Sequence, residues 1–414
     1  MRFLLLVALV AAVVSLLGAW AIVRLSHRYK LYPGIRERDV HTQPTPRLGG
    51  IAIVLGMLAA LAAASQISWF RPVFADPWPV LAIAAAALIM LAIGVVDDIL
   101  DLDWVTKLAG QLLVGGFLAW AGVQIVSLPV GPGEGITVLS PTLSLIITIL
   151  AVVLVMNAVN FIDGLDGLVA GVTLIAGGVF FAYSYILSIS TGQSAFNLAS
   201  MLMAVLLGAT LGFLPFNWHP AKIFMGDGGA LVIGMLMAVS TVTVTGQIDP
   251  ASIGSEQLLP AFIPLMLPFA VLIVPLLDFG LAVLRRLRAG KSPFSADRLH
   301  LHHRLLDMGH SHFHAVLIFY SWTAVVAVGT LAFMFVDWRI ALGGVAAGLI
   351  VCAIVTLAPL SRRKRVESAA QREPHPDAQL AQYDPLDAAA PPIDHEPDPR
   401  DAPVAETPEE TRRS

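Results

Sequence analysis

The chain has 414 residues, of which 57% are hydrophobic and only 13% are charged, with a mean hydropathy of +0.78 and a net charge of −4. Soluble proteins carry about 25% charged residues, so this composition excludes an ordinary soluble globular protein and indicates an integral membrane protein. The single cysteine, Cys352, excludes an intramolecular disulfide and a site made of paired cysteines.

Eleven apolar runs are long enough to cross a hydrocarbon layer about 30 Å thick, and each is expected to be helical because backbone groups in lipid must bond within their own segment. The first run, 3–25, is longer than a signal-peptide core and lacks a strongly basic start, so we interpret it as a retained span. We predict an all-α polytopic membrane protein with about eleven transmembrane helices. The other ten runs lie near 48–67, 78–96, 108–127, 142–158, 168–190, 197–216, 228–246, 258–281, 314–336 and 338–359.

The distribution of Lys and Arg predicts the orientation in the membrane. Fourteen basic residues follow the odd-numbered spans up to the ninth, whereas the N-terminus and the other connecting segments carry only Arg2, Arg71 and Arg339. The positive-inside rule therefore places the N-terminus outside and the C-terminus in the cytoplasm. Residues 1–362 are expected to form the membrane catalytic domain. Residues 363–414, which soon become rich in Pro, Asp, Glu and Ala, are expected to be a disordered cytoplasmic tail.

Five polar clusters, at 41–50, 97–107, 157–167, 216–229 and 291–304, all fall on the predicted cytoplasmic side. In one of them, Asn157, Asn160, Asp163 and Asp166 follow one another at three-residue intervals, which keeps neighbours in the series within reach on a helix. Such a stripe is either a solvated loop or a site for a phosphorylated ligand and a divalent cation. Because the clusters share one side, we expect a single composite site.

Four motifs carry a resemblance to a known family. DDILDL (97–102), NAVNFIDGLDGL (157–168), FMGD (224–227) and SADRLHLHHRLLDMG (295–309), in this order, resemble the polyprenyl-phosphate N-acetylhexosamine-1-phosphate transferases of glycosyltransferase family 4. The resemblance implies a polytopic enzyme of the bacterial plasma membrane with a cytoplasmic active site. It also implies transfer of a sugar 1-phosphate from a UDP-sugar to a lipid phosphate, with Mg²⁺ or Mn²⁺ as cofactor and UMP as the second product.

The residue types suit that chemistry. Attack of one phosphate on a pyrophosphate brings two anions together, so the site needs a divalent cation, positive side chains and a carboxylate. Asp227, between the glycines of MGDGG, is the expected metal ligand and a catalytic residue. By resemblance, Asp97 or Asp98 takes the proton from the lipid phosphate or orients it; the alternative is a cap where a helix leaves the membrane. Asp103 is interpreted as a solvated extra carboxylate.

Other residues are assigned to substrate binding. The resemblance places Asn160, Asp163 and Asp166 in the nucleotide-sugar pocket. Arg47 is expected to contact phosphate, and Lys107 either reaches the acceptor phosphate or snorkels to the interface. His302 is assigned a catalytic role, with its neighbours forming a basic clamp on the UDP pyrophosphate. A zinc site lacks a fourth ligand at motif spacing. The clamp residues are Arg298, His300, His303 and Arg304.

The expected reaction is transfer of N-acetylglucosamine 1-phosphate. The HLHHR sequence resembles this branch more than the branch that transfers MurNAc-pentapeptide 1-phosphate, which stays the alternative. A secondary transporter would place its acids near the bilayer midplane, whereas these lie at the predicted cytoplasmic ends. The expected partners are a polyprenyl phosphate lipid, a UDP-N-acetylhexosamine and the membrane, with no nucleic acid; a homodimer is left open.

Overall fold

The structure is a computed structural model that describes residues 1–29, 45–131, 135–191, 194–246 and most of 305–370, with a few positions between 284 and 290. The described part of the chain is mostly helical, as predicted, and contains one two-stranded sheet. Met1–Leu360 forms one compact unit, which contains the helix bundle. Of the second unit, only Ser361–Ala370 is described, and it continues the last helix.

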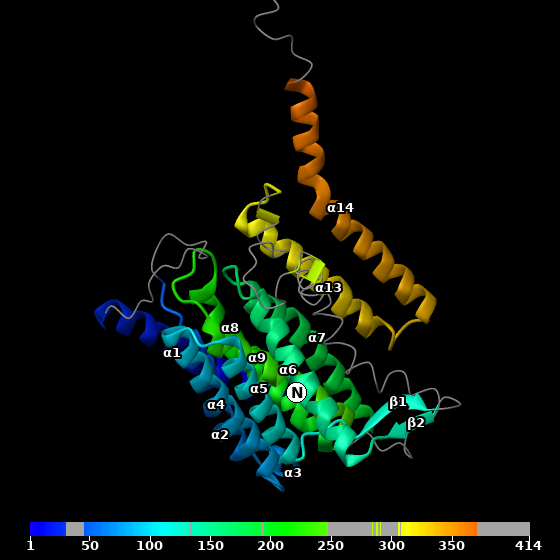
Figure 1. Cartoon of the computed structure of the whole chain (residues 1–414). Helices are drawn as coiled ribbons and strands as arrows, with labels where there is room; N and C mark the ends of the chain where they lie inside the picture. The colour runs from blue at the N-terminus through cyan, green and yellow to red at the C-terminus, as the bar shows by residue number, and fades with distance from the viewer. Residues whose placement is uncertain are drawn as a thin grey trace, which may run out of the picture. The chain divides into compact units, whose positions relative to one another are not determined.

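The elements follow the apolar runs closely (Figure 1). The helices that reach the site are α2, α4, α5, α6, α7, α8 and α9, and the other helices in the described residues are α1, α3, α13 and α14. Their bounds are α1 Arg2–Tyr29, α2 Gly49–Ser65, α3 Arg71–Phe74, α4 Trp78–Leu100, α5 Trp104–Trp120, α6 Pro141–Ile162, α7 Leu168–Thr191, α8 Ser194–Asn217, α9 Gly226–Gly246, α13 His312–Ala332 and α14 Trp338–Ala370, with a 3-10 turn η1 at Ser68–Phe70.

Eight of the described helices are long and apolar enough to cross a membrane, and α2 with its continuation through Ser68–Phe74 makes a ninth if this pair, bent by 90°, is one span. The predicted span 108–127 corresponds to α5, which has 17 residues and is followed by the sheet. The predicted span 258–281 lies outside the described residues. A polytopic helical membrane protein is thus confirmed, while the total of eleven and the orientation stay predictions.

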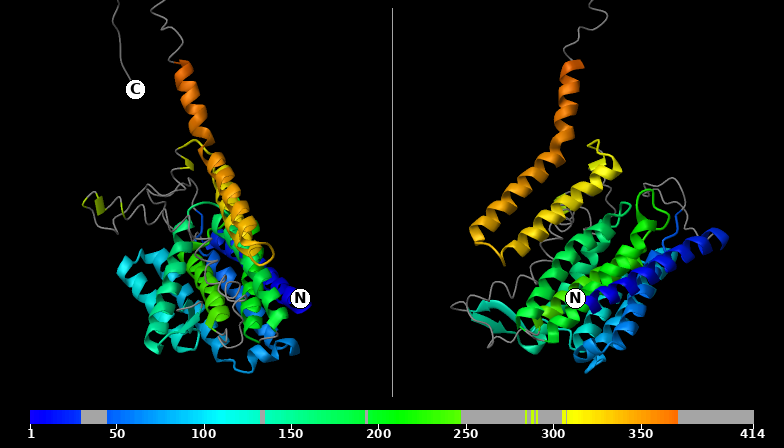
Figure 2. Two further views of the ribbon diagram at one scale, coloured as in Figure 1. Left: turned by 90° about the vertical axis from the view of Figure 1, so that its right-hand side faces the viewer. Right: turned by 180° about the vertical axis from the view of Figure 1, so that it is seen from behind.

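The core of the bundle is built around α9, which is buried over nearly its whole length and packs against α2, α4, α6 and α8. Helix α1 closes the bundle on α2 and α8 (Figures 1 and 2). Close approach of α4 to α9 depends on glycine, because a Cβ on Gly94 would lie 2.1 Å from the Cα of Gly228. Helices in lipid associate through such small residues since hydrophobicity alone does not drive them together.

A short antiparallel hairpin joins α5 to α6. Its strands are β1 (Ser127–Gly131) and β2 (Gly135–Val138), and Ser127 pairs with Val138. The sequence analysis, which predicted an all-α protein, did not include this hairpin. Helix α6 then starts at Pro141, where the Ser140 side chain accepts a hydrogen bond from the Leu143 N–H and so caps the helix.

Helix α13 lies against α7, and α14 lies beside α13 (Figure 1). The indole Nε1 of Trp322 donates to the Thr356 hydroxyl at 3.2 Å, and the Tyr320 hydroxyl donates to the Gly167 carbonyl at 2.6 Å. The predicted domain boundary at 362/363 falls within α14, which runs on to Ala370. Residues 371–414 lie outside the described residues, so the disordered tail stays a prediction.

Candidate active site

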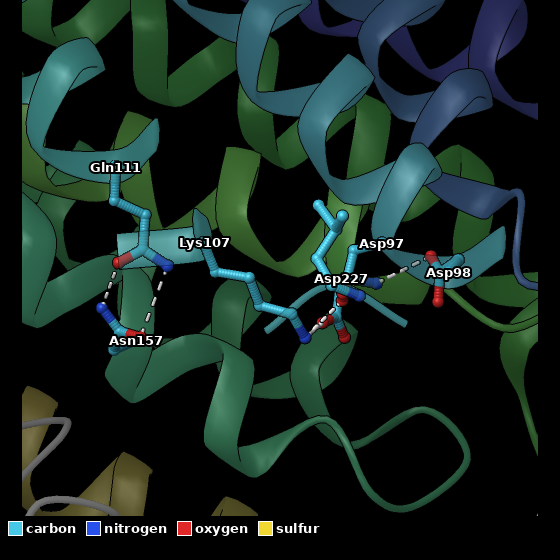
Figure 3. Close-up of polar contacts among 7 residues, drawn as sticks. Asp97, Asp98, Lys107, Gln111, Asn157 and Asp227 are labelled. Carbon is cyan, nitrogen blue, oxygen red and sulfur yellow. Dashed lines mark hydrogen bonds and ion pairs between the residues drawn. The ribbon is translucent and has the colours of Figure 1, made fainter. Parts of the chain in front are cut away.

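Charged side chains from three helices meet at one end of the bundle (Figure 3). Asp97 and Asp98 lie in the last turn of α4, Lys107 in the first turn of α5, and Asp227 in the first turn of α9. Their helix ends come together because α4 packs on both α5 and α9. The structure therefore brings two of the predicted clusters, 97–107 and 216–229, into direct contact.

The ammonium of Lys107 lies between two carboxylates. Its Nζ is 2.5 Å from Asp97 Oδ2 and 3.2 Å from Asp227 Oδ2. The Asp97 side chain is only 5% exposed and its other oxygen accepts the Leu102 N–H at 2.9 Å, whereas Asp227 is 31% exposed. Lys107 thus points into the site and not out to the interface, and Asp227 is the carboxylate that remains open to a ligand.

Asp98 holds the start of α9. Its Oδ2 accepts the backbone N–H of Asp227 at 3.1 Å, and Asp98 is itself buried. Gly226, with φ of +73°, sits against this carboxylate: a Cβ there would lie 2.5 Å from Asp98 Oδ2 and 2.2 Å from the Arg47 carbonyl oxygen. Only glycine fits this turn, both for its backbone angle and for the space.

The segment before α2 is tied to the segment before α9 by backbone hydrogen bonds. The Phe224 N–H donates to Pro46 O at 2.9 Å, and the Gly49 N–H donates to Phe224 O at 3.0 Å. This pairing brings the predicted cluster 41–50, as far as it is described, to the same end of the bundle. It also places Arg47 near enough to Asp98 and Asp163 for their charges to interact.

The asparagine and aspartate stripe at the end of α6 divides between the site and its surroundings. Asn160 approaches Asp227, yet its buried Nδ2 makes no well-formed hydrogen bond within the described part of the chain. Asp163, directly after α6, is half-buried; burial and the nearby negative charge of Asp227 raise its pKa to about 7, and Arg47 opposes this rise. Asn157 lies one turn deeper.

Asp166 is buried and organises the loop after α8. Its Oδ2 accepts the Ala221 N–H at 3.1 Å and lies 2.7 Å from His219 Nδ1. The His219 ring stacks on His312 at the start of α13, with centroids 5.6 Å apart. Whether Asp166 also lines a nucleotide-sugar pocket, as the resemblance implies, stays a prediction. Asp166 also has a structural role, since its carboxylate connects this loop to the DGLDG turn.

Three polar residues of this region had no assigned task in the sequence analysis. Gln111, one turn after Lys107, is buried and pairs with Asn157. His219 contacts Asp166. Asp103 is exposed and has a structural role, because it caps α5 by accepting hydrogen bonds from the N–H groups of Val105 and Thr106 at 3.1 Å. Hydrogen bonds from Thr106 lower the pKa of the Asp103 carboxyl. An Asp before a helix with Thr three residues later is a signal for such a cap.

The fifth predicted cluster, 291–304, lies outside the described residues. Arg298, His300, His302, His303 and Arg304 lie outside the described residues, so their predicted roles stay predictions. Only nearby positions such as Leu305 are described.

The arrangement suits a divalent cation held by few protein ligands. In the described residues no three His, Cys, Asp or Glu side chains converge as a ready metal site. Mg²⁺ needs no such set, because it usually takes one or two carboxylates and completes its octahedron with water and substrate phosphate. Asp97 and Asp227 meet this requirement, since one cationic group, the Lys107 ammonium, already contacts both. The donor set therefore fits Mg²⁺ or Mn²⁺.

Together these features define a polytopic membrane protein with a carboxylate-rich site, suited to a divalent cation, at one end of its helix bundle. Residues 80–245, which include the site residues of α4, α5, α6 and α9, match the family model "Glycosyl transferase family 4". The chain belongs to this family, which confirms the resemblance seen in its motifs.

Named relatives agree. The chain is 39% identical over 367 residues to the decaprenyl-phosphate N-acetylglucosaminephosphotransferase of Mycobacterium leprae, covering 88% of this chain and 92% of the relative. It is 31% identical over 289 residues to the undecaprenyl-phosphate alpha-N-acetylglucosaminyl 1-phosphate transferase of Yersinia pestis, covering 67% and 69%. It is 30% identical over 353 residues to the phospho-N-acetylmuramoyl-pentapeptide-transferase of Halalkalibacterium halodurans, covering 81% and 98%.

Proposed function

We propose that this protein transfers N-acetylglucosamine 1-phosphate from UDP-N-acetylglucosamine to a polyprenyl phosphate and releases UMP. The observation that carries the proposal is the convergence of Asp97 and Asp227 on one cation position at the end of the bundle. The similarity to decaprenyl-phosphate N-acetylglucosaminephosphotransferases over most of the chain supports this choice of sugar and acceptor. The acceptor lipid lies in the membrane, and the site lies at helix ends where a water-soluble nucleotide can reach it.

The reaction is a displacement at phosphorus. An oxygen of the acceptor phosphate bonds to the β-phosphorus of the UDP-sugar, and the bond from that phosphorus to the oxygen of UMP breaks. Both reactants are anions, so positive charge at the site lowers their repulsion. Lys107 and Arg47 supply it from the protein, and the unpaired amide of Asn160 beside Asp227 offers a donor to a substrate oxygen.

We assign Asp227 as the principal ligand of Mg²⁺ or Mn²⁺, because it is the more exposed member of the carboxylate pair. Bound there, the ion would supply Lewis-acid stabilisation of the charge that develops on the phosphate oxygens. Asp97, which shares the cation position, borders the acceptor phosphate and orients it. Asp98 is a positioning residue, since its carboxylate is engaged with the Asp227 backbone. The active site is assigned to the cytoplasmic face of a bacterial plasma membrane, in line with the distribution of basic residues.

The test uses purified enzyme in membranes with radiolabelled UDP-GlcNAc, polyprenyl phosphate and Mg²⁺. We expect a labelled lipid whose pyrophosphate-linked sugar is GlcNAc, and loss of that lipid when UMP is added in excess, because the reaction is reversible. The Asp227→Asn variant, inserted to the same level, is the control. The same assay is run with radiolabelled UDP-MurNAc-pentapeptide as the donor. A labelled lipid formed only from this second donor, or no lipid product with either donor, would overturn the proposal.

A further inference from the structure

A buried glutamine and a half-buried asparagine pair with each other next to the charged site. The Nδ2 of Asn157 on α6 donates to the Oε1 of Gln111 on α5, and Gln111 Nε2 donates back to Asn157 Oδ1 at 3.4 Å (Figure 3). Asn157 Nδ2 also donates to the Val153 carbonyl at 2.8 Å. Gln111 is only 3% exposed. A paired set of amides in an apolar bundle is directional, because a displaced partner leaves a buried donor or acceptor unsatisfied.

The pair lies one helical turn from Lys107. Residues four apart on a helix share a face, so Lys107 and Gln111 project from the same side of α5. Figure 3 shows the two side chains side by side, with Gln111 directed to α6 and Lys107 directed to Asp97 and Asp227. Any rotation or sliding of α5 on α6 would therefore move both groups together.

The neighbouring contact between α5 and α6 is apolar. On the next turn of α5 the contact with α6 is made by Gly115, where an added Cβ would lie 3.5 Å from Ile149, at ordinary van der Waals distance. Smooth apolar surfaces of this kind tolerate small shifts. A single buried polar pair is an established means of fixing the register of two helices.

We propose that the Gln111–Asn157 amide pair is a positioning device for Lys107: it sets the rotation of α5 on α6 that directs the Lys107 ammonium to Asp97 and Asp227. The effect on catalysis rests on the proposed function, in which Lys107 acts on phosphate. The effect of the amide pair on the direction of the Lys107 side chain does not depend on that function. The amide pair itself does not touch substrate.

The test compares three changes. Gln111→Leu leaves Asn157 Oδ1 without its donor, although Asn157 Nδ2 keeps its bond to Val153 O. The double variant Gln111→Leu/Asn157→Leu removes both amides, which restores stability because no polar group is left unsatisfied. Gln124→Leu is the matched control, since Gln124 also joins the α5 side to α6, through the Ser144 hydroxyl at 3.0 Å, but at the hairpin end. Each change is also made in a Lys107→Met background.

Two readouts separate positioning from folding. The first readout is enzyme kinetics. When Lys107 is present, Gln111→Leu and the double variant should lower kcat about tenfold and change KM for UDP-GlcNAc little. In the Lys107→Met background the same changes should alter kcat by less than about twofold, because the effects of residues that act as a unit are not additive. The second readout needs no activity: acetic anhydride labelling of the Lys107 amine, read by mass spectrometry. Labelling should rise severalfold in the double variant and stay unchanged in Gln124→Leu.

Unchanged Lys107 labelling in a folded double variant would overturn the proposal, as would kcat losses equal in both Lys107 backgrounds. If the wild-type enzyme forms no lipid product, the proposed function fails. The labelling result then still decides the positioning role.

Discussion

At the hairpin end of α5 and α6, the buried polar groups are neutral and find their partners within one stretch of sequence, whereas at the opposite end charged groups meet and Asp227 reaches its partners from a distant segment. Near the hairpin, the Ser144 hydroxyl donates to Ile125 O at 2.7 Å, and the Thr148 hydroxyl accepts the Ile125 N–H at 2.9 Å and donates to Ser144 O. No charge is involved in these contacts.

At the site end, Asp227 reaches Lys107 and Asp98, which precede it by 120 and 129 residues. Asp97 and Asp227 face one ammonium, Asp98 accepts the Asp227 backbone N–H, and Arg47 lies close to Asp98 and Asp163. The comparison shows that buried polarity by itself does not mark a functional site in this membrane protein. Carboxylates from separate segments that meet around one ammonium do mark it, because such a set suits a divalent cation and anionic phosphate groups.

The largest effect is expected from Asp227→Asn. This change keeps the side-chain shape but removes the charge that holds the metal, so turnover should fall on the order of 10³-fold, in the range seen when an electrostatic contact to the transition state is lost. Raising Mg²⁺ should restore part of it. Turnover across a metal series measures this, with Ser144→Ala at the hairpin end as control. Equal turnover of Asp227→Asn and wild type would show that the charged end is not the active site.

A smaller loss is expected from Asp98→Asn. The amide oxygen can still accept the Asp227 N–H, so the start of α9 should stay in place and turnover should fall by about tenfold or less. Asp98→Leu, which cannot accept this bond, should be far less active at equal expression. If Asn and Leu at this position reduce turnover alike, Asp98 acts through its charge and not by holding the backbone.

The charged end should also show a pH-dependent effect on stability. The pKa of Asp163 is about 7 in the folded protein, above the ordinary 3.8, so the folded state favours the protonated form. Its stability contribution is present below the unfolded pKa and declines as pH rises to about 7. Asp163→Asn should therefore raise Tm at pH 8 and leave it unchanged at pH 4, in detergent with a chelator. A gain of the same size at both values would contradict the assignment.

The smallest functional effect is expected at the hairpin end. Thr148→Val removes the hydroxyl that accepts the Ile125 N–H and leaves a buried donor unpaired, which costs about 1–3 kcal/mol. Tm should fall by a few degrees at both pH 4 and pH 8, and kcat should stay within about twofold. A fall in kcat as large as that of Asp98→Asn would remove the distinction between the two ends.

Much of this arrangement follows from the sequence, for physical reasons. Apolar runs predict helices, because in lipid the backbone can form hydrogen bonds only within its own segment. Basic residues predict which loops lie on the cytoplasmic side of the membrane. Together these two signals predicted one composite site. The convergence of Asp97 with Asp227 could be expected on that basis. The details of this convergence could not be predicted from the sequence. Hydropathy does not say which glycine faces which helix, so it predicts neither the contact of Gly94 with Gly228 nor the turn at Gly226.

Some features could not be predicted from the sequence for a different reason. Gln111 is a single polar residue in an apolar run, and its significance depends on a partner in α6 that periodicity cannot identify. The hairpin at 127–138 is short and rich in Gly and Pro, so its pairing is weakly encoded. The role of Asp103 was within reach, because a helix cap is a local signal.

The most direct test of the central claim is Mn²⁺ binding to purified protein without substrate, followed by electron paramagnetic resonance. If Asp97 and Asp227 converge on one cation position that Lys107 occupies in the absence of metal, Asp227→Asn should weaken Mn²⁺ binding. Lys107→Met should strengthen it about tenfold, because a competing positive charge is removed, even though the same variant loses turnover. Unchanged or weaker Mn²⁺ binding by Lys107→Met, or unchanged binding by Asp227→Asn, would contradict the account.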